Sequence, residues 1–423
     1  MSRFWYLCTL ARKSAWNRKG SLALVVLSIA LSAVLLVGIE RVRVQVRASF
    51  IQSVSGADLL VGARGSGLQL LLYAVFHLGA AAGDMSWAGA QRIAAKNDVA
   101  WAVPLSLGDS HKGFPVVATT REFFIHYRHQ RDKKLHFDQG EPFAGIFDVV
   151  LGAQVAKKTG YALGEKITLS HGSGKGGHTE HDDKAFAVTG ILAPTGTPVD
   201  NSLYISLESM EALHLDWQGG APIPGFRVQA EHAAKFNLTP KRVSALLVGL
   251  KHRVRVFAVQ RDVNNDAEEA LTAVMPGVVL DQLWDMLNTG ESALLLVSWM
   301  ATAVGLAGLV AVILAGLGER RRELAILRAA GAGPWDIVHL LALEGMLLML
   351  AGVVCGLAAL CALVAILGPV LAENYGMGIT LTPLEPGEWK LVGGIMAAGF
   401  LASLIPALQA YRMSLTDGLS VTT

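Results

Sequence analysis

The chain has 423 residues, of which 52% are hydrophobic and only 17% are charged, and its mean hydropathy is +0.43. Soluble domains carry about 25% charged residues, so this composition argues against an ordinary cytosolic enzyme. It also argues against intrinsic disorder, which requires low hydrophobicity and high net charge. The formal net charge is +2, from 36 basic and 34 acidic residues, so bulk charge gives no reason to expect a nucleic-acid partner. The composition predicts an integral membrane protein that carries a soluble portion.

Four apolar stretches are long enough to cross a bilayer, which takes about 20 residues. They are predicted as transmembrane helices at 21–40, 291–318, 338–368 and 391–410. An interfacial helix at 1–20 precedes the spans, and a tail at 411–423 follows them. Between the spans lie a large domain at 41–290, a cytoplasmic coupling loop at 319–337 and a short external loop at 369–390. The sequence thus predicts an α-helical membrane protein with four transmembrane helices and a large domain between the first and second.

A cleaved signal peptide is the alternative interpretation of the first span, because Ala30 and Ala33 offer small residues for cleavage. The apolar run continues through Leu35 to Gly38, past any such site, and the basic leader is long for a signal peptide. We therefore expect an uncleaved anchor, preceded by an interfacial helix whose aromatic and basic residues contact membrane lipids.

The distribution of lysine and arginine predicts the orientation of the spans, because cytoplasmic loops carry the excess. Basic residues cluster in the leader and in the loop after the second span, whereas the loop before the fourth span has only Lys390. Both termini are therefore expected in the cytoplasm, and the large domain is expected to be extracytoplasmic. Arg41, Arg43 and Arg47 follow the first span on the outer side, where they begin a long domain and the rule is weak.

The large domain shows short strands and short helices. Residues 148–152 are typical of a buried strand that leads into a short helix, and 166–170 and 184–191 alternate like strands. These two strands would form a long hairpin with the polar segment 171–183 at its tip. The mixture indicates an extracytoplasmic α+β domain, built as two lobes.

The end of the domain has a helical pattern at 267–275 and a strand pattern at 277–280. Residues 281–288 are then expected to form a helical stalk that leads into the second span. All three cysteines, Cys8, Cys355 and Cys361, lie outside the domain, so it holds no disulfide and must fold by burial alone.

The loop after the second span contains the sequence GERRRELAILRAAGAG at 318–333. It joins a dense basic cluster to an amphipathic helix and a glycine-rich end. One interpretation is a positive anchor that only fixes topology, and the other is a docking element for a cytoplasmic partner. The residues of this predicted coupling site are Glu319, Arg320, Arg321, Arg322, Glu323, Arg328 and Gly331.

This loop resembles that of the MacB/FtsX-like (LolC/LolE-type) family of ABC transporter permeases, whose pattern is close to ERRREIGILRALGA. Glu344-Gly345, followed by Gly352 and Gly356, resembles the family's glycine-bearing third helix, and 405–419 resembles its closing segment. Leu415 stands where that closing segment often has proline. The stretches VVLGAQVAKKTGYALGEKITL and FAVTGILAPTGTPVD resemble the family's external domain.

The resemblance implies a permease subunit in a bacterial inner membrane, with its large domain in the periplasm. It implies a second permease copy and a cytoplasmic ABC ATPase dimer that binds the ATP, while this chain itself holds no cofactor. The load would be a lipoprotein, a peptide or another envelope-side molecule, with a periplasmic adaptor or substrate protein as a further partner. Two alternatives stay open: an FtsX-type transducer that controls a cell-wall hydrolase, and a metal-linked export or binding system.

The segment GSGKGG at 172–177 is not a phosphate-binding loop, because that motif needs Gly, four residues and then Gly-Lys-Ser/Thr, whereas Lys175 is followed by Gly176. The ATPase is therefore expected on a separate chain. The sequence shows no nucleophile–base pairing, so we predict no catalytic residue.

The spans contain almost no ionisable groups apart from Glu344 and His339. A pathway for a polar solute would be lined by polar groups, so we expect helices that transmit movement rather than enclose a channel. Small residues spaced by four favour close helix packing, and Gly352 and Gly356, with Glu344 as an interface carboxylate, form the predicted packing site.

Eleven of the 12 histidines fall in the large domain. His171, His178 and His181 crowd the proposed hairpin tip together with Glu180 and two aspartates. Imidazole and carboxylate ligands both suit zinc, which makes a zinc site one interpretation. The other is a solvated, glycine-rich tip that binds nothing specific.

Overall fold

The computed structural model describes residues 19–53, 56–80, 83–129, 132–171, 184–218, 221–223, 228–319, 324, 326, 328–329, 331–375 and 381–412. The chain divides into two compact units, and each is described by itself. The helical unit comprises Met1–Gln45, Leu287–Val370 and Ile379–Thr423. The α/β unit comprises Val46–Met286 and Leu371–Gly378.

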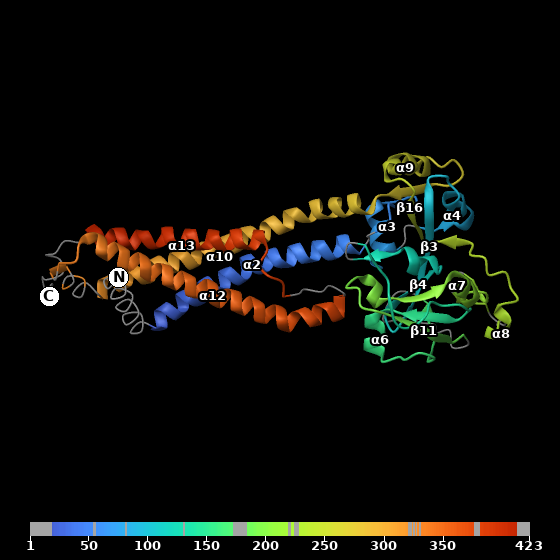
Figure 1. The fold of residues 1–423 in the computed structure, drawn as a ribbon, viewed down its shortest axis with the longest axis horizontal. Coiled ribbons are helices and arrows are strands. Elements are labelled where there is room, and N and C mark those ends of the chain that lie inside the picture. The colour runs from blue at the N-terminus through green and yellow to red at the C-terminus, as the bar shows by residue number, and fades with distance from the viewer. Residues whose placement is uncertain are drawn as a thin grey trace. The chain divides into compact units, whose positions relative to one another are not determined.

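Four long apolar helices are drawn in Figure 1: α2 (Lys19–Gln52), α10 (Pro276–Glu319), α12 (Pro334–Tyr375) and α13 (Pro386–Arg412). Each contains a stretch with a mean hydropathy between 2.0 and 2.9, and by length and composition each can cross a membrane. The four predicted spans lie inside these helices, and every helix extends beyond its predicted segment at both ends. The prediction of four apolar helices is confirmed.

Proline marks the start of three of these helices, because its missing N–H is not needed in the first turn. Pro276, Pro334 and Pro386 are the first residues of α10, α12 and α13. Pro369 directly follows the predicted third span, 338–368, yet it lies inside α12, which continues to Tyr375. Membrane helices tolerate an internal proline because neighbouring groups satisfy the freed carbonyl.

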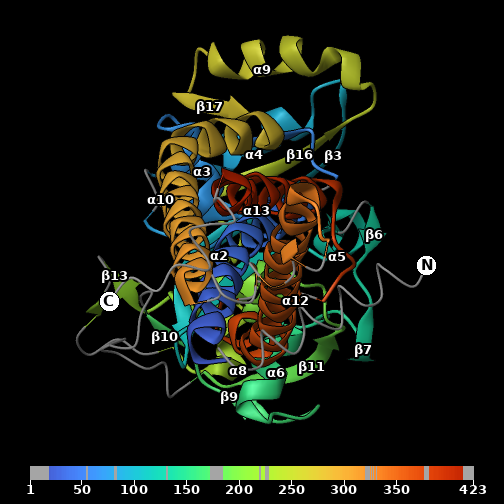
Figure 2. The same cartoon turned by 90° about the vertical axis from the view of Figure 1, so that its left-hand side faces the viewer.

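α2 packs among the other three helices of the helical unit (Figure 2). Its buried residues Leu36 and Val37 belong to one apolar cluster with Leu309 of α10, Leu341 of α12 and Ile395 of α13. In the view of Figure 2, α2 lies between α10, α12 and α13.

The α/β unit is built on one eleven-stranded sheet, whose main path has the order β17-β1-β16-β3-β4-β12-β8-β11-β7. Strand β10 pairs with β3, and β9 pairs with β11, beside this path. The strands are β1 (Leu59–Ala63), β3 (Val99–His111), β4 (Phe114–Thr119), β7 (Phe137–Gly140), β8 (Asp148–Leu151), β9 (Lys166–Ile167), β10 (Ser170–His171), β11 (Phe186–Leu192), β12 (Leu203–Ser206), β16 (Ala245–Leu250) and β17 (Leu271–Val274).

The pairing in this sheet is mixed. β12 is parallel to β4 and β11 is parallel to β8, whereas the other pairs are antiparallel. Three further two-stranded pairs are β2 (Met85–Ser86) with β15 (Arg242–Val243), β5 (Arg128–His129) with β6 (Lys133–Lys134), and β13 (Trp217–Gln218) with β14 (Ala221–Pro222). The short helices are α3 (Gly67–Ala74), α4 (Trp87–Ala94), α5 (Glu122–His126), α6 (Ala153–Thr159), η1 (Pro198–Asn201), α7 (Leu207–Leu213), α8 (Ala230–Ala233), η2 (Arg253–Arg255) and α9 (Val256–Asn264).

Both faces of the sheet are buried. Successive residues of a strand point to opposite faces, and Leu59 and Val61 of β1 accordingly join one apolar cluster whereas Leu60 joins the other. All three side chains are fully buried. The mixed α/β fold is thus confirmed, but the two predicted lobes are not, because a single sheet runs through the unit.

The predicted strand and helix at the centre of the domain are confirmed as β8 and α6. Gly160 ends α6 with φ 75°, in the left-handed region that favours glycine. The predicted hairpin is confirmed at its base, where Ile167 of β9 faces Phe186 of β11. Beyond that point the first strand leaves the hairpin, because Ser170 and His171 pair with β3 instead.

The assignments near the end of the domain were wrong. Residues 267–275, predicted as a helix, contain strand β17, which pairs along its length with β1. Residues 277–280, predicted as a strand, belong to α10, which begins at Pro276 and includes the expected stalk. The long-range pairing with β1 overrides the local helical pattern.

Candidate functional site: the polar network of α2 and α13

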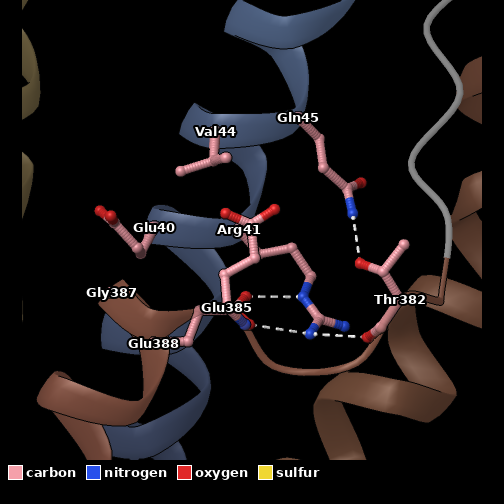
Figure 3. A pocket seen from close by; sticks show the side chains of 8 residues that line it. All are labelled: Glu40, Arg41, Val44, Gln45, Thr382, Glu385, Gly387 and Glu388. Atoms are coloured by element: carbon pink, nitrogen blue, oxygen red, sulfur yellow. Dashed lines mark hydrogen bonds and ion pairs between the residues drawn. The ribbon is translucent and has the colours of Figure 1, made fainter.

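A buried ion pair joins α2 to α13 (Figure 3). Nε of Arg41 donates to Oε1 of Glu388 at 2.7 Å, and Nη2 donates to Oε2 at 3.0 Å. The two side chains are 4% and 3% exposed. Two parallel N–H···O bonds of this kind are stronger and more directional than a single contact.

The start of α13 explains why Glu388 is held in place. Glu385 precedes Pro386, and Oε2 of Glu388 accepts the backbone N–H of Glu385 at 2.9 Å. A glutamate three positions into a helix that bonds back to the capping residue is half of a capping box. The same carboxylate therefore caps α13 and binds Arg41, so its orientation is set by backbone as well as by charge.

Two further bonds connect α2 to the segment before α13. Nη2 of Arg41 also donates to the carbonyl oxygen of Thr382 at 3.2 Å, and Nε2 of Gln45 donates to Oγ1 of Thr382 at 3.3 Å (Figure 3). The guanidinium thus binds one carboxylate and one carbonyl, both from the far end of the chain.

A second, weaker network joins α2 to α10. Nη2 of Arg43 donates to Oε1 of Glu40 at 2.8 Å, while Nη1 of Arg43 lies 3.7 Å from Oε2 of Glu291. Arg43 is 37% exposed, so solvent screens this network more than the Arg41–Glu388 pair.

A small cavity of about 70 Å³ lies beside the ion pair. It is lined by Glu40, Arg41, Val44, Gln45, Thr382, Glu385, Gly387 and Glu388, which come from α2, α13 and the segment before α13. The charged groups in this lining are carboxylates and one guanidinium bonded to a carboxylate. Their arrangement suits the fixing of two helices against each other.

Sequence reasoning noted Arg41 only as a basic residue at the start of the large domain, and it missed Glu388. The available signal was a charge at the end of one apolar run and another at the start of a second. Ionisable residues at membrane helices almost always have a partner or a function. The sequence could therefore have suggested that these two charges pair.

The glycines of the predicted packing site face α2. A Cβ atom on Gly352 would lie 2.6 Å from Cβ of Ile29, and one on Gly356 would lie 2.7 Å from the carbonyl oxygen of Ala30. Real Cβ atoms do not approach so closely, so glycine is required at both positions for α12 to pack against α2. Glu344, the third member of that site, is buried on α12 at 6% exposure.

The predicted coupling site is only partly described. Arg320, Arg321, Arg322 and Glu323 lie outside the described residues, and Glu319 is the last residue of α10. Arg328 is half-buried, and its carbonyl oxygen accepts the N–H of Gly331 at 3.0 Å. Gly331 has φ 95°, a conformation that favours glycine and ends the helical turn before α12.

The predicted zinc site is also only partly described. His171 lies in β10, opposite Asp109 of β3, and His178 and His181 lie outside the described residues. In the part of the chain that the structure describes, no three histidine, cysteine, aspartate or glutamate side chains are grouped to hold a metal ion.

Two ionic contacts involve residues close to that histidine-rich segment: Lys184 follows it in the chain, and Asp109 lies opposite His171. Nζ of Lys184, which is fully buried, donates to Oδ1 of Asp216 at 2.5 Å and to the carbonyl oxygen of Leu213 at 3.2 Å. Nε2 of His214 lies 3.5 Å from Oδ2 of Asp109. The flanking residue His171 is therefore held by its pairing with β3, and Lys184 is held by Leu213 of α7 and by Asp216.

These contacts shift the pKa values of two groups. Burial alone would raise the pKa of Asp216, but the Lys184 ammonium donates to it and the net pKa is lowered. Burial alone would lower the pKa of His214, but the hydrogen bond and charge of Asp109 raise the net pKa. The ionised forms of both groups are favoured in the folded unit.

One serine–histidine contact in the α/β unit has the geometry of a catalytic pair. Oγ of Ser202 lies 3.0 Å from Nδ1 of His77. Ser202 is fully buried, and burial lowers the pKa of His77 to about 4. A substrate cannot reach this serine, and the histidine is too weak a base to activate it. We therefore interpret the contact as a structural bond that holds the segment after α3 to the sheet.

Comparison with family models matches both parts of the chain. Residues 22–265, more than half of the chain, match the MacB-like periplasmic core domain, and residues 295–415 match the FtsX-like permease C-terminal domain. Together these matches include α2, the α/β unit up to α9, and most of α10, α12 and α13.

Curated relatives match a smaller part. The macrolide export ATP-binding/permease proteins MacB of Burkholderia lata and Burkholderia cenocepacia are each 30% identical over 146 residues, which is 31% of this chain. The chain spans 19% of the length of these relatives.

Two solved structures align with about half of the chain. The periplasmic region of MacB from Actinobacillus actinomycetemcomitans aligns with a TM-score of 0.34 at 10% identity, covering 55% of this chain and 97% of that one. The extracellular domain of the noncanonic ABC-type transporter YknZ from Gram-positive bacteria aligns with a TM-score of 0.31 at 10% identity, covering 51% and 98%.

Proposed function

Because the chain belongs to the MacB/FtsX-like family of ABC transporter permeases, we propose that it passes ATP-driven motion from a cytoplasmic ATPase to its periplasmic-type domain. The ATPase would be a separate ABC subunit that binds ATP, and two permease copies would complete the transporter. The moved load would be a lipoprotein, a peptide or another envelope-side molecule. Both termini and the segment 319–337 would lie in the cytoplasm.

The observation that carries this proposal is the continuity of long helices, of which α2 and α10 extend furthest into the α/β unit. α2 runs from Lys19 to Gln52 and α10 from Pro276 to Glu319, and each contains residues of both units without a helix break. A continuous helix has its backbone hydrogen bonds satisfied internally and resists bending, so it can carry a displacement along its length.

The polar groups of the helical unit support motion rather than solute passage. The charged groups Glu388 and Arg41 are bonded to each other. In addition, Gly352 and Gly356 let α12 pack closely against α2. A solute pathway would instead present polar groups to a water-filled space along the helices.

The test is ATP hydrolysis by the full chain co-expressed with its ABC ATPase subunit. Changing Arg320, Arg321 and Arg322 together to alanine should abolish co-purification of the ATPase or its activity in the complex, because a basic docking surface would lose three charges. The matched control changes three external arginines, Arg253, Arg255 and Arg261, to alanine and should leave hydrolysis unchanged. Unchanged hydrolysis in the first variant would contradict the docking role.

Two alternatives stay predictions. Co-purification of a cell-wall hydrolase with the chain would favour an FtsX-type transducer. Zinc binding by the full chain that is lost on changing His178 and His181 to alanine would favour a metal-linked system.

A further inference from the structure

The Arg41–Glu388 pair fixes more than the distance between two helices. Its two N–H···O bonds, at 2.7 and 3.0 Å, keep the guanidinium and the carboxylate in one plane. Apolar contacts between helices have no fixed direction, whereas this bidentate pair loses both bonds when either helix shifts. The pair therefore sets the register of α2 against the start of α13.

Backbone bonds on the α13 side strengthen this link. The carboxylate of Glu388 accepts the N–H of Glu385, and the guanidinium of Arg41 also donates to the carbonyl oxygen of Thr382. Arg41 is thereby bonded to the first turn of α13 and to the chain just before it (Figure 3). Any displacement of this end of α13 acts on Arg41 through several bonds at once.

The corresponding polar contact between α2 and α10 is weaker. Arg43 reaches Glu291 of α10 at 3.7 Å and is 37% exposed, whereas Arg41 and Glu388 are almost fully buried. Buried pairs are screened less than exposed ones, so the polar connection of α2 is directed mainly to α13.

We propose that Arg41 and Glu388 are positioning residues of the transport cycle, which make the outer end of α13 and the following part of α2 move together. A displacement of α13 would then pass through this pair to α2, the helix that continues to Gln52 in the α/β unit. The inference rests on the proposed function and names the contact through which motion reaches the first helix.

A purely structural role predicts a different outcome from a coupling role. Replacing a buried ion pair by apolar residues of similar volume is often neutral or stabilising, while removing one partner alone is strongly destabilising. The double variant Arg41→Met/Glu388→Leu should therefore fold, and it lacks the directional bonds. It separates loss of coupling from loss of the fold.

The experiment uses the full chain with its ATPase in lipid nanodiscs, and a nitroxide label at position 254 of each copy reports on the α/β unit. The label is attached to Val254→Cys in a chain whose native cysteines, Cys8, Cys355 and Cys361, are changed to serine. Val254 is 88% exposed, so the label should change the stability of the α/β unit little. Pulsed electron paramagnetic resonance measures the distance between the two labels without nucleotide and with ADP and vanadate. The rate of ATP hydrolysis is measured on the same samples.

We expect the distance distribution of the wild-type complex to shift on adding ADP and vanadate. Arg41→Met/Glu388→Leu should lose the shift while it retains ATP hydrolysis, because its nucleotide site lies on the other subunit. The matched control is Arg47→Met. It removes another arginine of α2, whose ion-pair partner Asp281 is exposed. This control should keep both the shift and the hydrolysis.

A full shift in Arg41→Met/Glu388→Leu would overturn the inference and leave the proposed function standing. A wild-type complex that hydrolyses ATP without any shift would overturn the proposed function, and the inference with it. If the double variant failed to fold, Arg41→Lys, which keeps the charge but not the bidentate geometry, should fold and show a reduced shift. A full shift in that variant would likewise overturn the inference.

Discussion

The two units of the chain bury charge in different places. In the helical unit, the buried Arg41–Glu388 pair lies at the point where α2 and α13 leave their apolar stretches, and the seam between α2 and α12 is made by Gly352 and Gly356. In the α/β unit, buried charge lies within the fold itself, as in the pair Lys184–Asp216. Charges are costly within the hydrocarbon region, so membrane-spanning helices make their close contacts with small residues and carry their charges near their ends.

The pairs also differ in sequence separation. Arg41 and Glu388 are 347 positions apart, whereas Lys184 and Asp216 are 32 apart. The first pair joins two helices from opposite ends of the chain. The second joins two nearby segments of the α/β unit. The first buried pair thus fixes the register between two helices, whereas the second joins a residue just before β11 to the segment after α7.

The largest expected effect tests the anchoring role of Lys184. Lys184→Met leaves the Asp216 carboxylate buried with its charge uncompensated, which should lower the free energy of unfolding by about 3–5 kcal/mol. The measurement is chemical unfolding of the full chain in detergent, followed by tryptophan fluorescence. Lys235→Met, at an exposed position of the same unit, is the control and should change stability by no more than about 0.5 kcal/mol. Equal stabilities would show that the pair anchors nothing.

The next effect tests whether small residues hold the helical unit together. Gly356→Ala places a methyl group 2.7 Å from the carbonyl oxygen of Ala30, and such overpacking should cost about 1–3 kcal/mol. Gly393→Ala on α13 meets no atom within 4 Å and should be neutral or stabilising, since alanine favours helix more than glycine. Unfolding in mixed detergent micelles compares the two. If Gly356→Ala were as stable as Gly393→Ala, the glycine seam would lose its assigned importance.

The smallest effect is a dependence on pH confined to the α/β unit. The net pKa of His214 is raised in the fold, so its contact with Asp109 contributes stability that is full below the unfolded pKa of about 6.5 and lost as pH rises through the folded pKa. His214→Gln should flatten the dependence of the melting temperature on pH across that interval, measured by scanning calorimetry. The exposed His232 is the control, and His232→Gln should leave the pH dependence unchanged. An identical pH dependence in all three proteins would argue against the contact.

The elements that could be predicted from the sequence are those set by local pattern. The four apolar runs correctly predicted four helices, and the pattern within 148–159 correctly predicted a strand followed by a helix. Both signals depend only on residues that are neighbours in the chain. The error at 267–280 arose where a distant partner decides the structure, since β17 forms only by pairing with β1. Pro276 carried a local signal for the start of α10 that the strand pattern obscured.

The candidate site was less predictable than the fold. Arg41 and Glu388 were each visible beside an apolar run, but their pairing depends on how α2 and α13 pack. The glycine seam was predictable in kind, because small residues spaced by four mark close helix contacts, whereas its partner α2 was not. The roles of Glu319 and of Arg320, Arg321 and Arg322 stay predictions, since they depend on a second protein.

The length of α2 ties the ion pair to the lipid around it. At about 1.5 Å per residue, the 34 residues of α2 measure about 51 Å, while the hydrocarbon core of a bilayer is about 30 Å thick. Arg41 lies about 33 Å along the helix from Lys19, so with Lys19 at one surface of the hydrocarbon core, Arg41 would lie near the opposite surface. A membrane with longer acyl chains would draw the guanidinium and carboxylate toward the low-dielectric region or tilt the helix to keep them out. We therefore expect the strength of the contact between α2 and α13 to depend on bilayer thickness.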